Sequence, residues 1–367
     1  MSQTSSIKRI GVLTGGGDCP GLNAVIRALV KTGLVEHSFE AYGVLDGYEG
    51  LVNNNMIRLS YEDVSGILTL GGTILGTSNT AHPFCYVEPG GDPSQPRDVS
   101  DRCVENTKNA GLDALFCIGG DGTLSIAHGL ALKGLPIVGV PKTIDNDLCG
   151  TDVTFGFDTA VQIVADALDR LHTTAMSHHR VIVLETMGRY AGWLALVGGM
   201  AGGGDVILIP EIPYSMDSVC RAVVDRSRRG RRFSIVVVSE GVKLPSGDHV
   251  VRGMVECGHD KTRLGGIAVW LANEIEDRTG LESRAVVLGH MQRGGTPTAC
   301  DRVLATRFGH AAVMQAAQGH LDVMVGLRGT EIVPVPLTDV ADRQRLVEPD
   351  CSVLRAARAV GTVFGDE

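Results

Sequence analysis

Short apolar runs that end in glycine or polar residues recur along the chain. They occupy residues 10–14, 114–118, 136–140, 181–184, 206–209, 235–238 and 285–288. Apolar residues fill mostly consecutive positions in these runs rather than alternate ones, which is typical of strands buried on both faces of a parallel sheet.

Segments with helical periodicity lie between these runs, at residues 23–34, 104–109, 125–132, 160–172, 219–228 and 265–279. Alternation of strands and helices predicts an α/β fold made of doubly wound lobes with mainly parallel sheets. No flexible linker interrupts the pattern, which favours two interleaved lobes over separate domains joined by a tether.

Composition narrows the class of protein. The 367 residues carry a net charge of −9, which gives no broad basic surface for nucleic acid. Nine scattered cysteines without close spacing indicate reduced thiols. The first nine residues lack the apolar segment of a secretory signal, and the glycine-rich uncharged stretch 191–204 is too short to cross a bilayer. We therefore expect a cytoplasmic protein with no membrane or nucleic-acid partner.

Two glycine-rich segments follow predicted strands, where open α/β sheets bind ligands. Residues 15–23 read GGGDCPGLN and precede a helix, so their backbone N–H groups could face an anion or simply form a tight turn. The spacing departs from GxGxxG, and the chain holds no GxxxxGK[ST], which disfavours dinucleotide folds and P-loop NTPases. In the second segment, 119–123, Asp121 is a candidate Mg²⁺ ligand, or else a cap for the helix that follows.

A third polar loop, PKTIDND at residues 141–147, places a lysine and two aspartates together after a strand. Neighbouring carboxylates raise one another's pKa, which suits one of them to proton transfer. The structural alternative is a set of Asx turns.

These segments occur in order with Met187-Gly188-Arg189 and the GHMQRGG string at 289–295. Together they resemble the bacterial-type 6-phosphofructokinases over roughly residues 7–320. The resemblance implies Mg²⁺-dependent transfer of a phosphoryl group from ATP to the 1-hydroxyl of fructose 6-phosphate. NAD and diacylglycerol kinases share a GGDGT-like element, but they lack the TIDND and GHxQRGG strings found here.

The resemblance also implies roles for individual residues. Asp145 matches the general base, Thr143 and Arg189 match groups that hold the transferring phosphoryl, and Asp121 matches the Mg²⁺ ligand. The expected donor-binding residues are Gly16, Asn79, Gly120, Asp121, Gly122 and Thr123. The expected sugar-phosphate residues are Thr143, Ile144, Asp145, Arg180, Met187, Gly188, Arg189, Glu240, Arg284, His290, Met291, Gln292 and Arg293.

In this family Arg180 and Arg284 match arginines that complete a neighbouring subunit's site, so we expect a homotetramer, with a homodimer as the alternative. The implied lobes have discontinuous boundaries. Residues 1–156 and 292–343 would bind ATP and Mg²⁺, and residues 157–291 and 344–367 would bind fructose 6-phosphate.

The phosphoryl donor depends on two positions. Gly122 is typical of ATP-dependent members, whereas Lys142 is typical of pyrophosphate-dependent members, and Asn79 stands where many ATP-dependent members have arginine. An aspartate at 122 would exclude the α-phosphate of ATP, while a lysine at 142 adds attraction without excluding it, so we expect ATP. Pyrophosphate is the alternative donor, and a non-catalytic sugar-phosphate-binding subunit is the alternative of another class.

Overall fold

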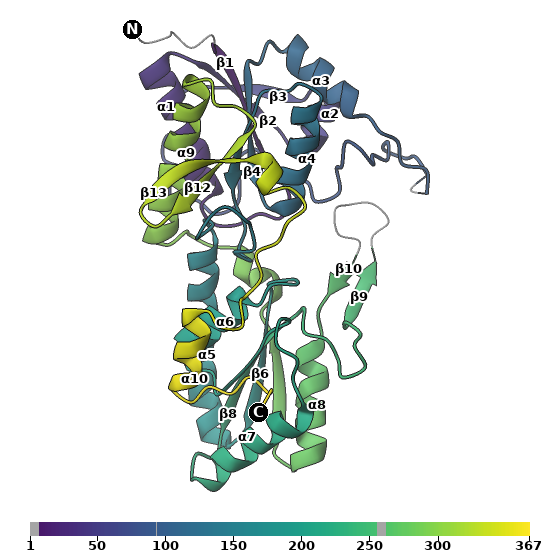
Figure 1. Cartoon of the computed structure of the whole chain (residues 1–367), viewed down its shortest axis with the longest axis vertical. Helices are drawn as coiled ribbons and strands as arrows, with labels where there is room; N and C mark the ends of the chain where they lie inside the picture. Colours follow the sequence, from purple (N-terminus) through teal and green to yellow (C-terminus); the bar gives the residue numbers. More distant parts are fainter. Residues whose placement is uncertain (1–6, 93, 255–261) are drawn as a thin grey trace.

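A computed structural model of the chain describes residues 7–92, 94–254 and 262–367. Its larger sheet has seven strands in the order β13-β12-β5-β4-β1-β2-β3 (Figure 1). The bounds are β1 (Arg9–Thr14), β2 (Glu40–Val44), β3 (Met56–Leu59), β4 (Ala114–Gly119), β5 (Ile137–Pro141), β12 (Val323–Arg328) and β13 (Glu331–Pro336). The outermost strand on each side, β3 and β13, pairs antiparallel, and the remaining neighbours are parallel.

Alternate residues of the larger sheet pack on its two faces. Ile10 and Val12 belong to a core shared with α1 (Leu22–His37) and α9 (Ala299–Ala317). Leu13 belongs to a second core. The helices that build this second core are α2 (Tyr48–Asn53), α3 (Ser100–Asn109) and α4 (Asp121–Leu132). Helices on both faces explain the continuous apolar runs in the sequence.

A smaller sheet has four parallel strands in the order β11-β6-β8-β7, drawn below the larger one in Figure 1. Its strands are β6 (Val181–Thr186), β7 (Val206–Leu208), β8 (Ser234–Ser239) and β11 (Ser283–Val287). One face packs on α5 (Phe157–His178), α6 (Trp193–Ala201) and α10 (Ser352–Ala359), and the other packs on α7 (Met216–Arg228) and α8 (Ile267–Thr279).

The α/β class with mainly parallel sheets is confirmed, and all seven apolar runs form strands. Strands β2, β3, β12 and β13 are absent from the prediction. Strands β2 and β3 are short and include polar residues, and prolines interrupt β13. Helix α9 is also absent from the prediction. Its buried stripe consists largely of alanine and glycine, which carry little hydrophobic signal. Gly309 in that stripe lets α9 approach α1 closely, since a Cβ there would lie 2.6 Å from that of Ala28.

Two further expectations concern the chain as a whole. Eight cysteines are unpaired, and the ninth, Cys257, lies outside the described residues. Within the described ranges, no helix combines the length and apolar character needed to cross a membrane.

Short 3₁₀ helices occur at Gly289–Arg293 (η1) and Leu337–Asp339 (η2).

Candidate active site

A cavity of about 680 Å³ lies where the carboxyl ends of strands from both sheets meet. The larger sheet contributes loops that follow β1, β4 and β5, and the smaller sheet contributes segments that follow β6, β8 and β11. Fourteen of the residues predicted for the site line it: Gly16, Asn79, Gly120, Asp121, Gly122, Thr123, Lys142, Thr143, Asp145, Met187, Arg189, Glu240, His290 and Arg293. Such edges are where open α/β sheets bind ligands.

The two glycine-rich loops support one another. The Gly15 N–H donates to the carbonyl of Ile118 (2.9 Å), and the Thr77 hydroxyl donates to the carbonyl of Gly16 (2.6 Å). A Cβ at Gly15 would lie 2.7 Å from the side chain of Thr123, so glycine is needed for the loops to approach this closely. The buried Tyr48 hydroxyl donates to the carbonyl of Thr123 (2.7 Å) and fixes the start of α4.

Three carboxylates, those of Asp121, Asp145 and Asp147, act on one another at this edge. Burial first, and then the charges of Asp145 and Asp121, raise the pKa of Asp147 well above its usual value. Burial and neighbouring negative charge both favour the protonated form of Asp147. Asp145 is 6% exposed, and its Oδ1 has no hydrogen-bond partner among the described residues. A buried acceptor without a partner calls for a donor that the described residues do not supply.

Lys142 lies beneath the first loop and is 3% exposed. Its ammonium donates to the carbonyl of Gly17 (2.5 Å), and burial lowers its pKa. Lys142 also lines the cavity, so an anion bound there would offer its ammonium a second acceptor.

The loop after β6 is held against the loop after β8. Arg189 has a left-handed backbone (φ 48°), and its N–H donates to Glu240 Oε1 (3.3 Å). A side chain at Gly241 would overlap the carbonyl oxygen of Arg189, so only glycine fits there. Burial, followed by the charge of Asp145, raises the pKa of Glu240 to about 7.

The GHMQRGG string forms η1, in which side chains three residues apart share one side. His290 and Arg293 accordingly both line the cavity. Met291 is 71% exposed, and Gln292 is fully buried, with its Oε1 accepting from the Met187 N–H (2.9 Å). The structure thus places Met291 and Gln292 outside the cavity lining, and Gln292 positions Met187.

Four other predicted residues also lie outside the lining of the cavity. Ile144 is buried in the core, and Gly188 contributes only a turn, with its carbonyl accepting from Ala191. Arg180 and Arg284 both pair with Glu282 Oε1, at 2.8 and 2.5 Å. Within this chain neither arginine is part of the cavity lining.

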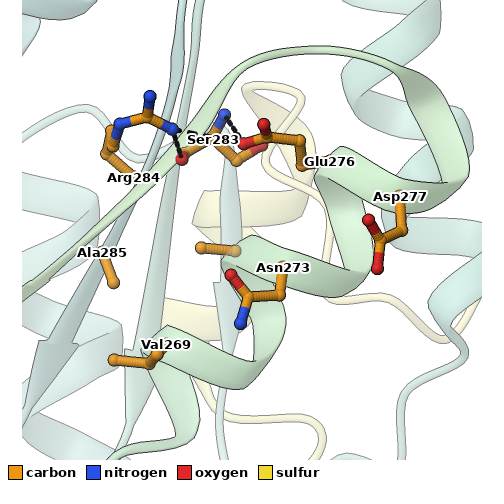
Figure 2. A pocket seen from close by; sticks show the side chains of 8 residues that line it. Val269, Asn273, Glu276, Asp277, Ser283, Arg284 and Ala285 are labelled. Atoms are coloured by element: carbon orange, nitrogen blue, oxygen red, sulfur yellow. Dashed lines mark hydrogen bonds and ion pairs between the residues drawn. The ribbon is translucent and has the colours of Figure 1, made fainter.

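Arg284 borders a separate surface pocket of about 430 Å³ between α8 and β11. Figure 2 shows Arg284 and Glu276 on either side of Ser283, which bonds to both. The Ser283 N–H donates to Glu276 Oε2 (2.9 Å), and Arg284 donates to the Ser283 carbonyl (2.6 Å).

Several cavity residues escaped the sequence prediction. They are Glu185 and Thr186 at the end of β6, Tyr48, and Arg252 and Arg263 on a hairpin between β8 and α8. Glu185 carried a detectable signal, because it is a charged residue at the carboxyl end of an apolar strand. It is 2% exposed and accepts from the Gly266 and Ala268 N–H groups (2.9 Å each), so it caps α8.

The donor atoms suit a hard cation. Asp121 Oδ2 accepts from Gln344 Nε2 (3.2 Å) and faces the cavity, with Asp145 nearby. Among the described residues, no group of three or more His, Cys, Asp or Glu side chains could hold a metal by itself. Mg²⁺ typically binds through one or two carboxylates, with water and substrate phosphates completing its shell, and Asp121 fits that pattern.

Comparison with known proteins identifies the family. The family model described as phosphofructokinase matches residues 9–316. The chain belongs to the phosphofructokinase family.

Curated relatives carry two different names. An ATP-dependent 6-phosphofructokinase of Chloroflexus aurantiacus is 50% identical, with 99% of each chain covered. A pyrophosphate–fructose 6-phosphate 1-phosphotransferase of Amycolatopsis methanolica is 51% identical, with 93% of this chain and 97% of that protein covered.

A solved structure agrees with the assignment. The phosphofructokinase of Saccharomyces cerevisiae superposes with a TM-score of 0.76 at 33% identity, covering 91% of this chain and 44% of that longer chain.

Proposed function

We propose that the protein is an ATP-dependent 6-phosphofructokinase, which transfers the terminal phosphoryl of ATP to the 1-hydroxyl of fructose 6-phosphate and acts in the cytoplasm. The observation that carries this proposal is the single cavity in which Asp121, Asp145 and Arg189 meet, contributed by loops of both sheets. A non-catalytic subunit would not need these three side chains together.

Asp145 is the general base in this proposal. Its buried Oδ1 lacks a partner within the described chain, and the sugar 1-hydroxyl would supply the missing donor. The raised pKa of Asp147 favours its protonated form, which reduces the repulsion between Asp145 and a second buried carboxylate.

Arg189 and Thr143 hold the transferring phosphoryl, whose charge is spread over its equatorial oxygens. Thr143 Oγ1 accepts from the Asp145 N–H (3.1 Å), so the phosphoryl contact and the base belong to one rigid loop. Gly16, Asn79, Gly120, Gly122 and Thr123 would form the donor side of the cavity.

The sugar phosphate would lie against the smaller sheet. Glu240, Met187, His290 and Arg293 line that side, and Gln292 fixes the backbone of Met187. Glu240 in its ionised form would accept hydrogen bonds from the sugar hydroxyls, and Arg293 offers a planar fork to phosphate.

Asp121 would hold Mg²⁺, which neutralises charge on the donor phosphates when it is bound. Asp121 begins α4, so backbone N–H groups in the first turn of that helix would face the same phosphates.

Two proposals concern organisation. The division into lobes 1–156 with 292–343, and 157–291 with 344–367, is supported by the two sheets, each built from strands of one lobe. Assembly into a homotetramer, or at least a homodimer, would bring Arg180 and Arg284 to a partner's sugar phosphate.

The donor assignment is tested by comparing turnover of Mg-ATP with that of Mg-pyrophosphate at saturating fructose 6-phosphate. Pyrophosphate is the second candidate, because Lys142 lines the cavity and a relative of equal identity is named for that donor. We expect ATP to have the higher kcat/KM, and Gly122→Asp to lower it at least 100-fold by excluding the α-phosphate. Faster turnover of pyrophosphate by the unmodified enzyme would contradict the proposal.

A further inference from the structure

An antiparallel hairpin borders the cavity between the two sheets. It comprises β9 (Val251–Met254) and β10 (Thr262–Leu264), and it stands apart from both sheets in Figure 1. Arg252 and Arg263 are exposed residues of its two strands, and both line the cavity.

A β-bulge brings the two arginines to the same side of the hairpin. Arg263 pairs with Gly253 and Leu264 pairs with Val251, so Arg252 is an extra residue without a partner. In a regular strand, neighbours of Gly253 would point away from the face that Arg263 occupies, and a bulge breaks this alternation. Gly253 opposite Arg263 adds no side chain that would fill the space between the two guanidinium groups.

The charge of the cavity explains why additional cations are needed. Five carboxylates line it, from Asp18, Asp121, Asp145, Glu185 and Glu240, and five cations face them, from Lys142, Arg189, Arg252, Arg263 and Arg293. Both proposed substrates carry phosphate, so without the hairpin three cations would oppose five carboxylates and the incoming anions.

The guanidinium groups of the hairpin arginines are also freer to bind a ligand than the charged groups of Lys142 and Arg293. Lys142 donates to the Gly17 carbonyl, and Arg293 donates to the Asp18 carbonyl (3.2 Å). Neither the Arg252 nor the Arg263 guanidinium forms a hydrogen bond or ion pair with any residue that the structure describes. The Arg252 side chain passes close to Gly265. A Cβ placed on Gly265 would lie 3.2 Å from Arg252 Nε and 3.1 Å from Glu185 Oε1, at the start of α8.

We infer that Arg252 and Arg263 form a phosphate-binding pair that grips a phosphoryl group of one substrate from the hairpin side of the cavity. A guanidinium presents parallel N–H donors to phosphate oxygens, and two such groups match the dianion of a phosphate monoester or a donor terminus. This inference deepens the proposed function and rests on it. The sugar phosphate and the donor share this chemistry, so the test has an arm for each.

The test measures binding by calorimetry rather than activity. Arg252→Gln, Arg263→Gln and the double variant are compared with wild type and with Arg328→Gln, an exposed arginine at the end of β12 outside the cavity lining. The ligands are fructose 6-phosphate, the β,γ-imido analogue of ATP, and pyrophosphate. We expect Kd for one of these to rise about tenfold or more in each hairpin variant, and less than twofold in Arg328→Gln.

A loss confined to fructose 6-phosphate assigns the pair to the sugar phosphate, and a loss confined to the other two ligands assigns it to the donor. Arg252→Lys and Arg263→Lys retain the positive charge but lose the planar fork of N–H donors. Their Kd values should therefore lie between those of wild type and of the glutamine variants. Kd values within twofold of wild type for every ligand would overturn the inference. Wild-type turnover of ATP with fructose 6-phosphate, measured on the same preparation, tests the proposed function separately.

Discussion

Asp145 holds a buried carboxylate oxygen that meets no donor within the described chain, while its neighbour Asp147 has a raised pKa. Leaving a buried acceptor unpaired costs about 1–3 kcal/mol, which a substrate hydroxyl would recover on binding. The two aspartates that flank Asn146 therefore differ: Asp145 has an unpaired acceptor, and the surroundings of Asp147 favour its protonated form.

Asp145→Asn should lower kcat by about 10²–10⁴-fold, because the amide cannot take the proton from the sugar hydroxyl. The KM for fructose 6-phosphate should change only a few-fold, since the shape of the loop is kept. Asp147→Asn is the matched control. Asp147→Asn should lower kcat far less, because an amide resembles the protonated form of the acid. Steady-state kinetics measure both, and retention of more than half of wild-type kcat by Asp145→Asn would refute the assignment.

Glu240 gives the folded state a pH dependence. Its pKa in the folded protein is about 7, against a usual value of 4.5, so between these values the folded state binds more protons than the unfolded state. The contribution of Glu240 to the free energy of unfolding must therefore fall as pH rises from 4.5 to 7, by about 3 kcal/mol at most.

Glu240→Gln removes this titration. The free energy of unfolding of wild type minus that of the variant, from denaturant titrations between pH 4.5 and 8, should fall through that window and level off above pH 7. Glu282→Gln is a matched control, because its ion pair with Arg180 lowers the pKa of Glu282 and places its titration at lower pH. A difference that stays flat, or that rises with pH, would contradict a raised pKa.

At the scale of elements, helix α5 starts without a cap of its own. Its N-cap residue is Gly156, and the buried carboxylate of Asp301 on α9 accepts from the N–H groups of Gly156 (2.9 Å) and Thr159 (2.8 Å) and from the Thr159 hydroxyl (2.5 Å). A helix that connects the two sheets is thus tied at its beginning to a helix packed on the larger sheet.

Asp301→Ala would leave these three buried donors without an acceptor. We expect this substitution to lower the free energy of unfolding by about 3 kcal/mol or more. Asp301→Asn should lower it by less, because the amide keeps one acceptor oxygen. Asp169→Ala, an exposed aspartate on α5, should change it by less than about 0.5 kcal/mol. Chemical denaturation gives these values. Equal losses at positions 301 and 169 would show that the capping bonds do not stabilise the protein.

Elements with strong periodicity were predictable from the sequence, and those stabilised by partners were not. Strands such as β4 and β6 are apolar because both faces are covered, so their sequences alone reveal them. Helix α9 depends on close contact with α1 through alanine and glycine, a tertiary property. In the site, loops at the strand ends were found from their glycines and acids. Arg252 and Arg263 were missed because a β-bulge directs them to the cavity, and no sequence motif marks that bulge.

At the scale of the whole molecule, Arg180 and Arg284 share Glu282 at the β11 edge of the smaller sheet and take no part in lining this chain's cavity. A role in phosphate binding therefore requires a second chain. In such an assembly each site combines Asp145 of one chain with arginines of its partner.

Mixing Arg180→Ala with Asp145→Asn should then restore activity after subunit exchange. A chain with intact Asp145 meets a partner with intact Arg180 in about a quarter of randomly mixed sites, so activity should approach that fraction of wild type. Arg189→Ala mixed with Asp145→Asn is the control. Both residues line the cavity of one chain, so exchange should create no intact site and recover nothing. Exchange is verified by native mass spectrometry of isotope-labelled chains. If the Arg180 mixture exchanged fully yet stayed as inactive as the control, Arg180 would serve its own chain or none, and the shared site would be rejected.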